Sequence, residues 1–308
     1  MRKSLEIIAC LFIVGGLSAG PVVAEDRLFR FPDIHENIIV FSHAGDLWTV
    51  AATGGQARRI TTHEGLELFG RFSPDGTQIT FSGEYDGDMN VYVMPTAGGT
   101  PKQLSYHPGI QNAPERMGPE NMVLDWTPDG SNVLFRSRKF SYEIFVGQLF
   151  LVSPLGGYPT QMPMPEASFA KFSPDGKKIV YTPIGRDFRQ WKRYKGGMAQ
   201  DVWIFDLATY DAEKITDWIG SDNVPLWIGD KIYFNSDRTG TLNIFCYDPA
   251  TKQTTQITNY TEYDVRWPES GPGGKIIFEN GGYLFILDTG TSQIRKVEIT
   301  LGDDRTWM

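Results

Sequence analysis

The repeat that indicates the fold reads Phe72-Ser-Pro-Asp-Gly-Thr-Gln-Ile-Thr-Phe81. Close copies of its first half begin at Trp126 and Phe172, and weaker copies begin at Trp227 and Trp267. In each close copy an aromatic residue ends one strand, a Pro-Asp-Gly turn follows, and a short strand begins. Proline presets φ for such a turn and glycine accepts a positive φ, so the chain doubles back there. Copies about 40–55 residues apart indicate an array of one repeated supersecondary unit.

Six such units follow one another, and each has the pattern of four short strands. In every unit the second strand is rich in aliphatic residues, and the third carries an aliphatic-aromatic pair such as Val91-Tyr92. No stretch sustains the 3.6-residue apolar period of a helix. Apolar residues at neighbouring positions cover both faces of these strands. Packing between two neighbouring blades of a propeller requires this, whereas a two-sheet sandwich would leave one face polar.

We therefore predict an all-β fold: a six-bladed β-propeller of four-stranded antiparallel blades, preceded by a signal peptide. Its first strand is expected at Leu28–Phe31 and its last at Arg295–Thr300. The way in which the ring closes does not follow from the pattern. The predicted propeller covers residues 25–308, with blades at about 28–62, 68–105, 122–163, 168–216, 223–258 and 263–300.

The N-terminus has the pattern of a secretory signal peptide. Arg2 and Lys3 precede an apolar run, Ile7–Leu17, and small residues stand just before Glu25. That run is shorter than the roughly 20 residues needed to span a bilayer. We therefore predict that residues 1–24 are removed on export and that the protein is periplasmic or secreted, with no membrane span after cleavage. An uncut membrane anchor is the alternative.

The counts of charged residues and of cysteines limit which partners and which covalent links we expect. The chain has 29 basic and 37 acidic side chains, a formal net charge of −8. This acidic balance disfavours nucleic acid as a partner, because phosphate binding needs a basic face. Cleavage of the signal would leave only Cys246, so no internal disulfide is expected. Because Cys246 aligns with aliphatic residues of other third strands, we predict a buried thiol.

The antiparallel order assigns the connections to two faces of the ring. The turns between strands one and two, and between strands three and four, are short and share one face. The loops between strands two and three share the other face with the crossovers between blades. These hold nearly all the extra length, as in Thr182–Gln200 and Ser105–Asn121. Function usually lies on long loops, so we expect it on that second face.

Patterns for catalysis or metal binding are weak. No Gly-x-Ser-x-Gly occurs, and no histidine follows a triad-like pattern with a serine. His63 and His107 occupy equivalent crossovers, but no third ligand is spaced to complete a metal site. We expect hydrogen bonding there, and neither a metal nor another cofactor. A hydrolase centre in the central channel would need a set of polar side chains, and the sequence alone indicates none.

Basic residues gather in two neighbouring loops on the long-loop face. Arg136, Arg138 and Lys139 belong to the third blade, and a second group with interleaved aromatic residues belongs to the fourth. A basic patch on an acidic protein can hold a carboxylate or dock an acidic surface. The alternative is ordinary solvated charge, with Trp191 packed over the blade. The fourth-blade candidates are Arg186, Arg189, Trp191, Lys192, Arg193, Tyr194 and Lys195.

The sequence around these candidates resembles a known family. The run Trp191-Lys-Arg-Tyr-Lys-Gly-Gly-Met-Ala-Gln-Asp-Val-Trp-Ile-Phe205 is similar to the fourth-blade signature of the tricorn protease family. The similarity covers essentially all of residues 25–308. The Pro-Asp-Gly repeats themselves are shared with the Tol-system and prolyl-oligopeptidase propellers. Further matching motifs are Phe31–His35 with Asp46–Trp48, Tyr106–Gly109, Ile215–Trp218, Ile232–Arg238 and Asn280–Leu284.

The resemblance implies the N-terminal six-bladed propeller of a serine peptidase, a hydrolase. The predicted signal peptide implies export, in which this chain departs from the cytosolic archaeal type of the family. In that family a second propeller, a PDZ domain and the peptidase domain follow, and the six-bladed ring forms part of the passage for peptides. Two basic residues in the crossover into the third blade help to anchor the substrate's C-terminal carboxylate. This chain has Glu115-Arg116 there, which makes Arg116 the remaining candidate. The resemblance implies that the catalytic residues lie beyond Met308.

We therefore expect a non-catalytic propeller that gates or guides peptides and docks on the catalytic modules. The expected partners are peptides and the downstream propeller, PDZ and peptidase domains of a parent chain, with homo-oligomerisation left open. The alternative is a free-standing periplasmic propeller that binds a protein or a peptide, similar to the Tol-system scaffold.

Overall fold

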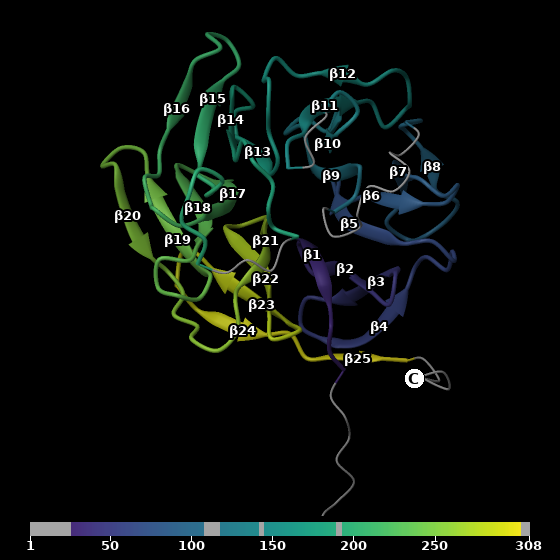
Figure 1. Ribbon diagram of the computed structural model, residues 1–308. Coiled ribbons are helices and arrows are strands. Elements are labelled where there is room, and N and C mark those ends of the chain that lie inside the picture. The colour runs from purple at the N-terminus through teal and green to yellow at the C-terminus, as the bar shows by residue number, and fades with distance from the viewer. Residues whose placement is uncertain (1–25, 108–117, 142–144, 189–192, 303–308) are drawn as a thin grey trace, which may run out of the picture.

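The polypeptide folds as a ring of six β-blades around a central axis (Figure 1). The computed structural model describes residues 26–107, 118–141, 145–188 and 193–302. Within each blade the four strands are antiparallel and follow one another in chain order. The predicted six-bladed propeller is thereby confirmed.

The strands of the first three blades are β1 (Arg30–His35), β2 (Ile38–His43), β3 (Asp46–Ala51) and β4 (Gly55–Arg59); β5 (Glu67–Phe72), β6 (Gln78–Glu84), β7 (Met89–Pro95) and β8 (Lys102–Gln103); and β9 (Asn121–Trp126), β10 (Val133–Ser137), β11 (Gln148–Val152) and β12 (Thr160–Gln161). Those of the last three are β13 (Ala170–Phe172), β14 (Lys178–Tyr181), β15 (Trp203–Asp206) and β16 (Ala212–Lys214); β17 (Asp222–Ile228), β18 (Lys231–Ser236), β19 (Asn243–Asp248) and β20 (Gln253–Gln256); and β21 (Arg266–Gly271), β22 (Lys275–Asn280), β23 (Tyr283–Asp288) and β24 (Ile294–Lys296).

The first strand of each blade lies at the axis. Strand β1 contacts both β5 and β21, and the other first strands contact their neighbours in the same way around the ring. Their C-terminal ends lead into the short turns between strands one and two. We call that end of the ring the turn face and the opposite end, with the longer loops and crossovers, the loop face.

One cross-strand pair of large side chains recurs in the core of every blade. It joins the second strand to the third; in blade 6 its two rings stack with their centroids 5.7 Å apart. Such aromatic pairs contribute roughly 0.5–1.5 kcal/mol beyond the burial of their area. This explains why the pattern repeats so regularly in the sequence. The pairs are Phe41 with Trp48, Phe81 with Tyr92, Phe135 with Phe150, Tyr181 with Trp203, Phe234 with Phe245 and Phe278 with Phe285.

A short additional strand closes the ring. Strand β25 (Ile299–Leu301) leaves blade 6 and pairs in parallel with β4 at the outer edge of blade 1. Gly55 N donates to Glu298 O at 2.8 Å, where β25 begins. On the other side of the same junction, Phe29 N donates to Gly282 O at 3.2 Å. The first and last blades are therefore joined by a fifth strand and by the N-terminal segment (Figure 1).

Three expectations about the strands need correction. The first strand is Arg30–His35 and not Leu28–Phe31. The predicted last strand, Arg295–Thr300, is two strands, because the chain turns away from blade 6 after β24 and then forms β25. The third concerns the repeat copy placed at Trp267.

The repeat copy at Trp267 is out of register with the others. Ser270, and not Trp267, lies opposite Ile276. This is the place that Phe72 takes opposite Ile79 in blade 2. Blade 6 thus lacks the turn aromatic of blades 2 to 5, and its Trp267 belongs to a different level of the axis. Across the described ranges, no helix has the length and apolar character needed to cross a membrane.

Two equivalent glycines give a test of the closing strand. Gly54 and Gly98 occupy the same turn of blades 1 and 2, with φ of 91° and 92°. A Cβ at Gly54 would lie 2.5 Å from Glu298 O, whereas one at Gly98 would have its nearest neighbour, Ile60 O, at 3.9 Å. Alanine at either place costs about 1–2 kcal/mol in the left-handed conformation. At Gly54 it must also displace β25, for which we expect about 1–3 kcal/mol more.

The measurement is the urea midpoint of wild type, Gly54→Ala and Gly98→Ala. We expect Gly54→Ala to be clearly the less stable of the two variants. Equal losses in both variants would mean that β25 contributes nothing measurable to holding the ring together.

Candidate functional site

Six equivalent positions of the first strands form a ring around the axis. In each blade this position lies one residue before that of the turn aromatic. It pairs with an equivalent residue of the second strand in all six blades. Arg71, for example, lies opposite Thr80, and Glu269 opposite Ile277. We call this set the axial ring. Its members are Asp33, Arg71, Asp125, Lys171, Leu226 and Glu269.

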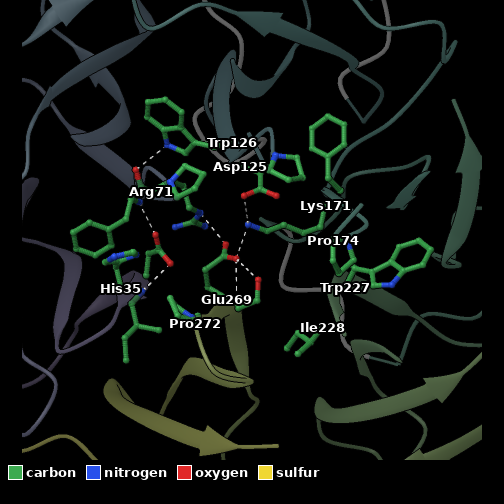
Figure 2. A pocket seen from close by; sticks show the side chains of 18 of the residues that line it. His35, Arg71, Asp125, Trp126, Lys171, Pro174, Trp227, Ile228, Glu269 and Pro272 are labelled. Atoms are coloured by element: carbon green, nitrogen blue, oxygen red, sulfur yellow. Dashed lines mark hydrogen bonds and ion pairs between the residues drawn. The ribbon is translucent and has the colours of Figure 1, made fainter. Parts of the chain in front are cut away.

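Glu269 lies between two basic residues of the axial ring (Figure 2). Its Oε2 is 2.8 Å from Arg71 Nε, and its Oε1 is 2.5 Å from Lys171 Nζ. Both bases also donate to Leu124 O, Arg71 Nε at 3.3 Å and Lys171 Nζ at 3.0 Å. Lys171 reaches Asp125 Oδ1 at 3.3 Å. These contacts tie blades 2, 3, 4 and 6 together across the axis.

Two carboxyl groups of the ring, those of Asp33 and Asp125, have shifted pKa values. Burial, followed by the neighbouring Glu269 carboxylate, raises the pKa of Asp33 to about 7, against the opposing effect of Arg71 and Lys171. Burial also raises the pKa of Asp125, against Lys171. Burial lowers the pKa of Lys171, but Asp125 and Glu269 outweigh it, so the pKa of Lys171 is raised. Asp33 is further held by the N–H groups of Ile34 and Phe72, at 2.8 and 2.7 Å.

A cavity of about 500 Å³ opens above the axial ring on the turn face. All six blades contribute to it, and the charged members of the ring form its floor (Figure 2). Aromatic residues from the ends of the first strands and prolines from the turns line the rest. They are Phe72, Trp126, Phe172 and Trp227, with Pro74, Pro128, Pro174 and Pro272.

Aromatic side chains fill the axis on the other side of the ring. Phe31 packs against Phe69 with ring centroids 4.1 Å apart, and against Trp267 at 4.8 Å. All three residues have positive φ, between 49° and 56°, at bulges that re-aim the side chains of a strand. Phe188, from the loop between the second and third strands of blade 4, adds a further ring 5.1 Å from Trp267. The cavity on the turn face is therefore a blind pocket.

The structure places the predicted fourth-blade residues in different environments. Arg186 is buried, donates from Nη1 to Met198 O at 2.7 Å, and lies over the ring of Tyr194 at 4.0 Å. Arg193 is exposed and reaches Gly240 O of the neighbouring blade at 3.4 Å, and Lys195 is exposed. Arg116, Arg189, Trp191 and Lys192 lie outside the described residues.

The basic residues of the third-blade loop are mostly internal. Arg136 is buried and donates to Ser168 Oγ and Pro119 O at 3.2 and 3.1 Å. Burial, followed by Arg138, lowers the pKa of Arg136 to about 10. Arg138 pairs with the Glu120 carboxylate at 2.9 Å. Of this group only Lys139 is exposed, so these arginines hold blade 3 in place and do not form a basic surface.

Reasoning from the sequence missed the axial ring. The expectation that the channel holds no set of polar side chains is wrong, since five of its six ring positions are charged. The signal was present in the repeats, where Arg71-Phe72, Asp125-Trp126 and Lys171-Phe172 place a charged residue before each aromatic. Glu269 was not assigned to the same position, because the repeat copy of blade 6 was placed at Trp267 and is out of register.

Two other predictions, for Cys246 and for His63, can be checked directly. Cys246 is buried, as predicted, and burial raises the pKa of its thiol. His63 Nδ1 accepts a hydrogen bond from Gly65 N at 2.9 Å, which confirms hydrogen bonding in that crossover. Among the residues that the structure describes, no three histidine, cysteine or acidic side chains are grouped to hold a metal ion.

Comparison with known proteins gives the family. Residues 26–293 match the family described as the tricorn protease N-terminal beta propeller domain. The chain belongs to this family. It is 27% identical over 286 residues to tricorn protease homolog 1 of Streptomyces coelicolor, covering 92% of this chain and 26% of that protein. The crystal structure of the tricorn protease superposes with a TM-score of 0.76 at 26% identity, covering 88% of this chain and 26% of the other.

Two further comparisons are with proteins that are not full-length tricorn proteases. A protein of Sulfurisphaera tokodaii named as a tricorn-like protease N-terminal subunit is 22% identical over 182 residues, covering 57% of this chain and 85% of its own length. TolB of Acinetobacter baumannii shares the fold, with a TM-score of 0.54 at 18% identity over 74% of this chain and 53% of TolB. This chain spans about a quarter of the length of the full-length tricorn relatives that it matches.

The raised pKa of Asp33 predicts a specific pH dependence of stability. Because the folded-state pKa of about 7 lies above the ordinary value of 3.8, the folded protein holds a proton between these values that the unfolded chain has lost. The stabilisation is complete below the unfolded pKa and is lost as the pH rises through about 7. Glu67, whose pKa burial also raises to about 7, adds a change of the same sign.

Comparison with Asp33→Asn isolates the contribution of Asp33. The variant does not titrate, so its urea midpoint relative to wild type should rise from about pH 5 to about pH 8. Any constant loss from the altered hydrogen bonds cancels in this difference. A difference that stays flat over the range would show that Asp33 titrates alike in the folded and unfolded chains.

Proposed function

We propose that this propeller is the non-catalytic N-terminal part of an exported tricorn-like serine peptidase, that it docks on the other tricorn components, and that it guides peptides. The observation that carries the proposal is the family match over residues 26–293. The existence of proteins named as separate N-terminal and C-terminal subunits of tricorn-like proteases supports docking between such parts. The pattern of residues 1–24 supports export.

The geometry favours guidance over the loop face and not through the ring. Phe31, Phe69 and Trp267 are buried and fill the axis, and Phe188 packs on them from the loop face. A peptide would have to displace these rings to pass along the axis. The longest loops lie on that same face, where Arg193 and Lys195 are exposed cations.

A free C-terminal carboxylate is the chemical group that these cations would recognise. A charge-assisted hydrogen bond contributes about 1.5–3 kcal/mol, equivalent to roughly 10–100-fold in affinity. Arg116 adds a further cation in the crossover that the family resemblance points to. Arg186 is buried against Tyr194 and would support the loop and not contact a ligand.

The test compares fluorescently labelled peptides with a free C-terminus and the same peptides amidated. We expect the chain to bind the free acids roughly 10-fold more tightly, and more so at low salt. The preference should be lost in Arg193→Ala/Lys195→Ala or in Arg116→Ala. Lys177→Ala is the matched control, because its side chain is 78% exposed in a turn on the opposite face. The chain alone should hydrolyse none of these peptides.

Other outcomes would contradict parts of the proposal. Equal binding of acids and amides would remove carboxylate recognition and leave the propeller as a docking scaffold. Hydrolysis by the purified chain would contradict a non-catalytic role. Failure to associate with any tricorn C-terminal component, together with capture of an unrelated envelope protein, would favour the free-standing alternative.

A further inference from the structure

We propose that the blind pocket on the turn face binds a cationic side chain, an ammonium or a guanidinium group, presented by a peptide. This goes beyond the proposed function, which concerns docking and the loop face. The argument rests on the charges of the pocket floor, on the shape and lining of its walls, and on its closed inner end.

The floor carries one carboxyl group more than it has bases. Asp33, Asp125 and Glu269 face Arg71 and Lys171. Glu269 engages both bases, and Lys171 lies closer to Glu269, at 2.5 Å, than to Asp125, at 3.3 Å. Asp125 is thus less neutralised by the bases than Glu269 is.

Asp125 is also the member of the floor that a ligand can reach. Its side chain is 27% exposed, against 8% for Arg71, 9% for Lys171 and 3% for Glu269. A cation that enters the pocket therefore meets a carboxylate, while the two bases are shielded behind their ion pairs. An entering anion would find no base that is not already paired.

The walls fit the apolar part of a long basic side chain. Aromatic residues of four blades line the cavity just above the floor, and prolines of four blades line its outer part. A cation over an aromatic face gains about 0.5–2 kcal/mol, and the aliphatic stem of lysine or arginine packs well on apolar walls. The volume of about 500 Å³ lies within the range of small-ligand pockets.

The closed inner end determines what can enter. Because aromatic rings fill the axis behind the floor, a side chain can insert from the turn face but the peptide backbone cannot thread through. The acidic chain, with a net charge of −8, attracts basic peptides over longer distances. The pocket therefore suits one inserted basic residue of a peptide that lies across the turn face.

The binding should depend on pH through the groups that face Asp33. These are Arg71 on β5, Lys171 on β13, Glu269 on β21 and, further along the floor, Asp125 on β9. His35, on the same strand as Asp33, also lines the pocket. Loss of the Asp33 proton adds a negative charge to the floor, so a cationic ligand should bind more tightly above neutral pH than below it.

The experiment uses tripeptides blocked at both ends with arginine, lysine, citrulline or norleucine in the middle. Calorimetric titration of the wild-type chain should give at least roughly 10-fold tighter binding for arginine and lysine than for their neutral analogues. Acetyl-arginine amide, tested beside them, distinguishes a site for any free cation from one that needs a peptide. Binding of the arginine tripeptide should also shift the NMR signal of the Trp126 indole N–H, which lines the pocket, and leave that of Trp48 in place.

Two variants that each remove one carboxylate test where the peptide binds. Asp125→Asn should weaken the arginine tripeptide roughly 10-fold. Asp230→Asn, which removes an exposed carboxylate from the turn between the first two strands of blade 5 on the same face, should leave binding unchanged. Thermal unfolding monitors whether each variant is folded, and the comparison of arginine with citrulline needs no variant at all.

Three results would overturn the proposal. One is equal affinity for the arginine and citrulline tripeptides, and another is no binding of either at millimolar concentration. The third is an equal loss in Asp125→Asn and Asp230→Asn, which would mean that the acidic surface in general attracts the peptide.

Discussion

The structure depends on one shared carboxylate, that of Glu269. It holds Arg71 of blade 2 and Lys171 of blade 4 at the same time. Removal of one partner of a buried ion pair costs about 3–5 kcal/mol, because the remaining charge is left without compensation. The first strands of these blades must therefore keep their mutual distances, and each blade extends outward from its first strand. Charge at the centre thus sets the positions of elements that are themselves held together by apolar packing.

The same ring of charges divides the axis into two different environments. On the turn face it forms the floor of a pocket open to solvent, and towards the loop face it adjoins packed aromatic rings. The bulges at Phe31, Phe69 and Trp267 make this possible, since they lie two residues before Asp33, Arg71 and Glu269 on the same strands. Backbone strain of about 1–3 kcal/mol at each bulge is tolerated where the surroundings fix the conformation. The two faces of one propeller can therefore serve different ligands.

The fold could be predicted from the sequence because its signals are local. The Pro-Asp-Gly turns recur in three blades and the cross-strand aromatic pairs in all six, and each signal lies within a few residues. The closing strand β25 could not be predicted, because three residues pair with a strand about 240 positions earlier and no local pattern marks a parallel addition. For the site, Arg136 and Arg193 look alike in the sequence, yet one is buried and the other exposed. The charged ring was overlooked because its members neutralise one another only across the axis.

The position of β25 has a consequence for how the protein is made. The six blades emerge in order during synthesis or export, but Gly55 meets Ile299 only when almost the whole propeller has emerged. Until then the blades form an open arc, and Arg71 and Lys171 have not yet formed their ion pairs with Glu269. Contacts between such distant residues are slow to form and leave incomplete chains exposed to aggregation. A delay before the final blade should therefore expose more of the unclosed chain to chaperones and proteases than a delay of equal length before an earlier blade.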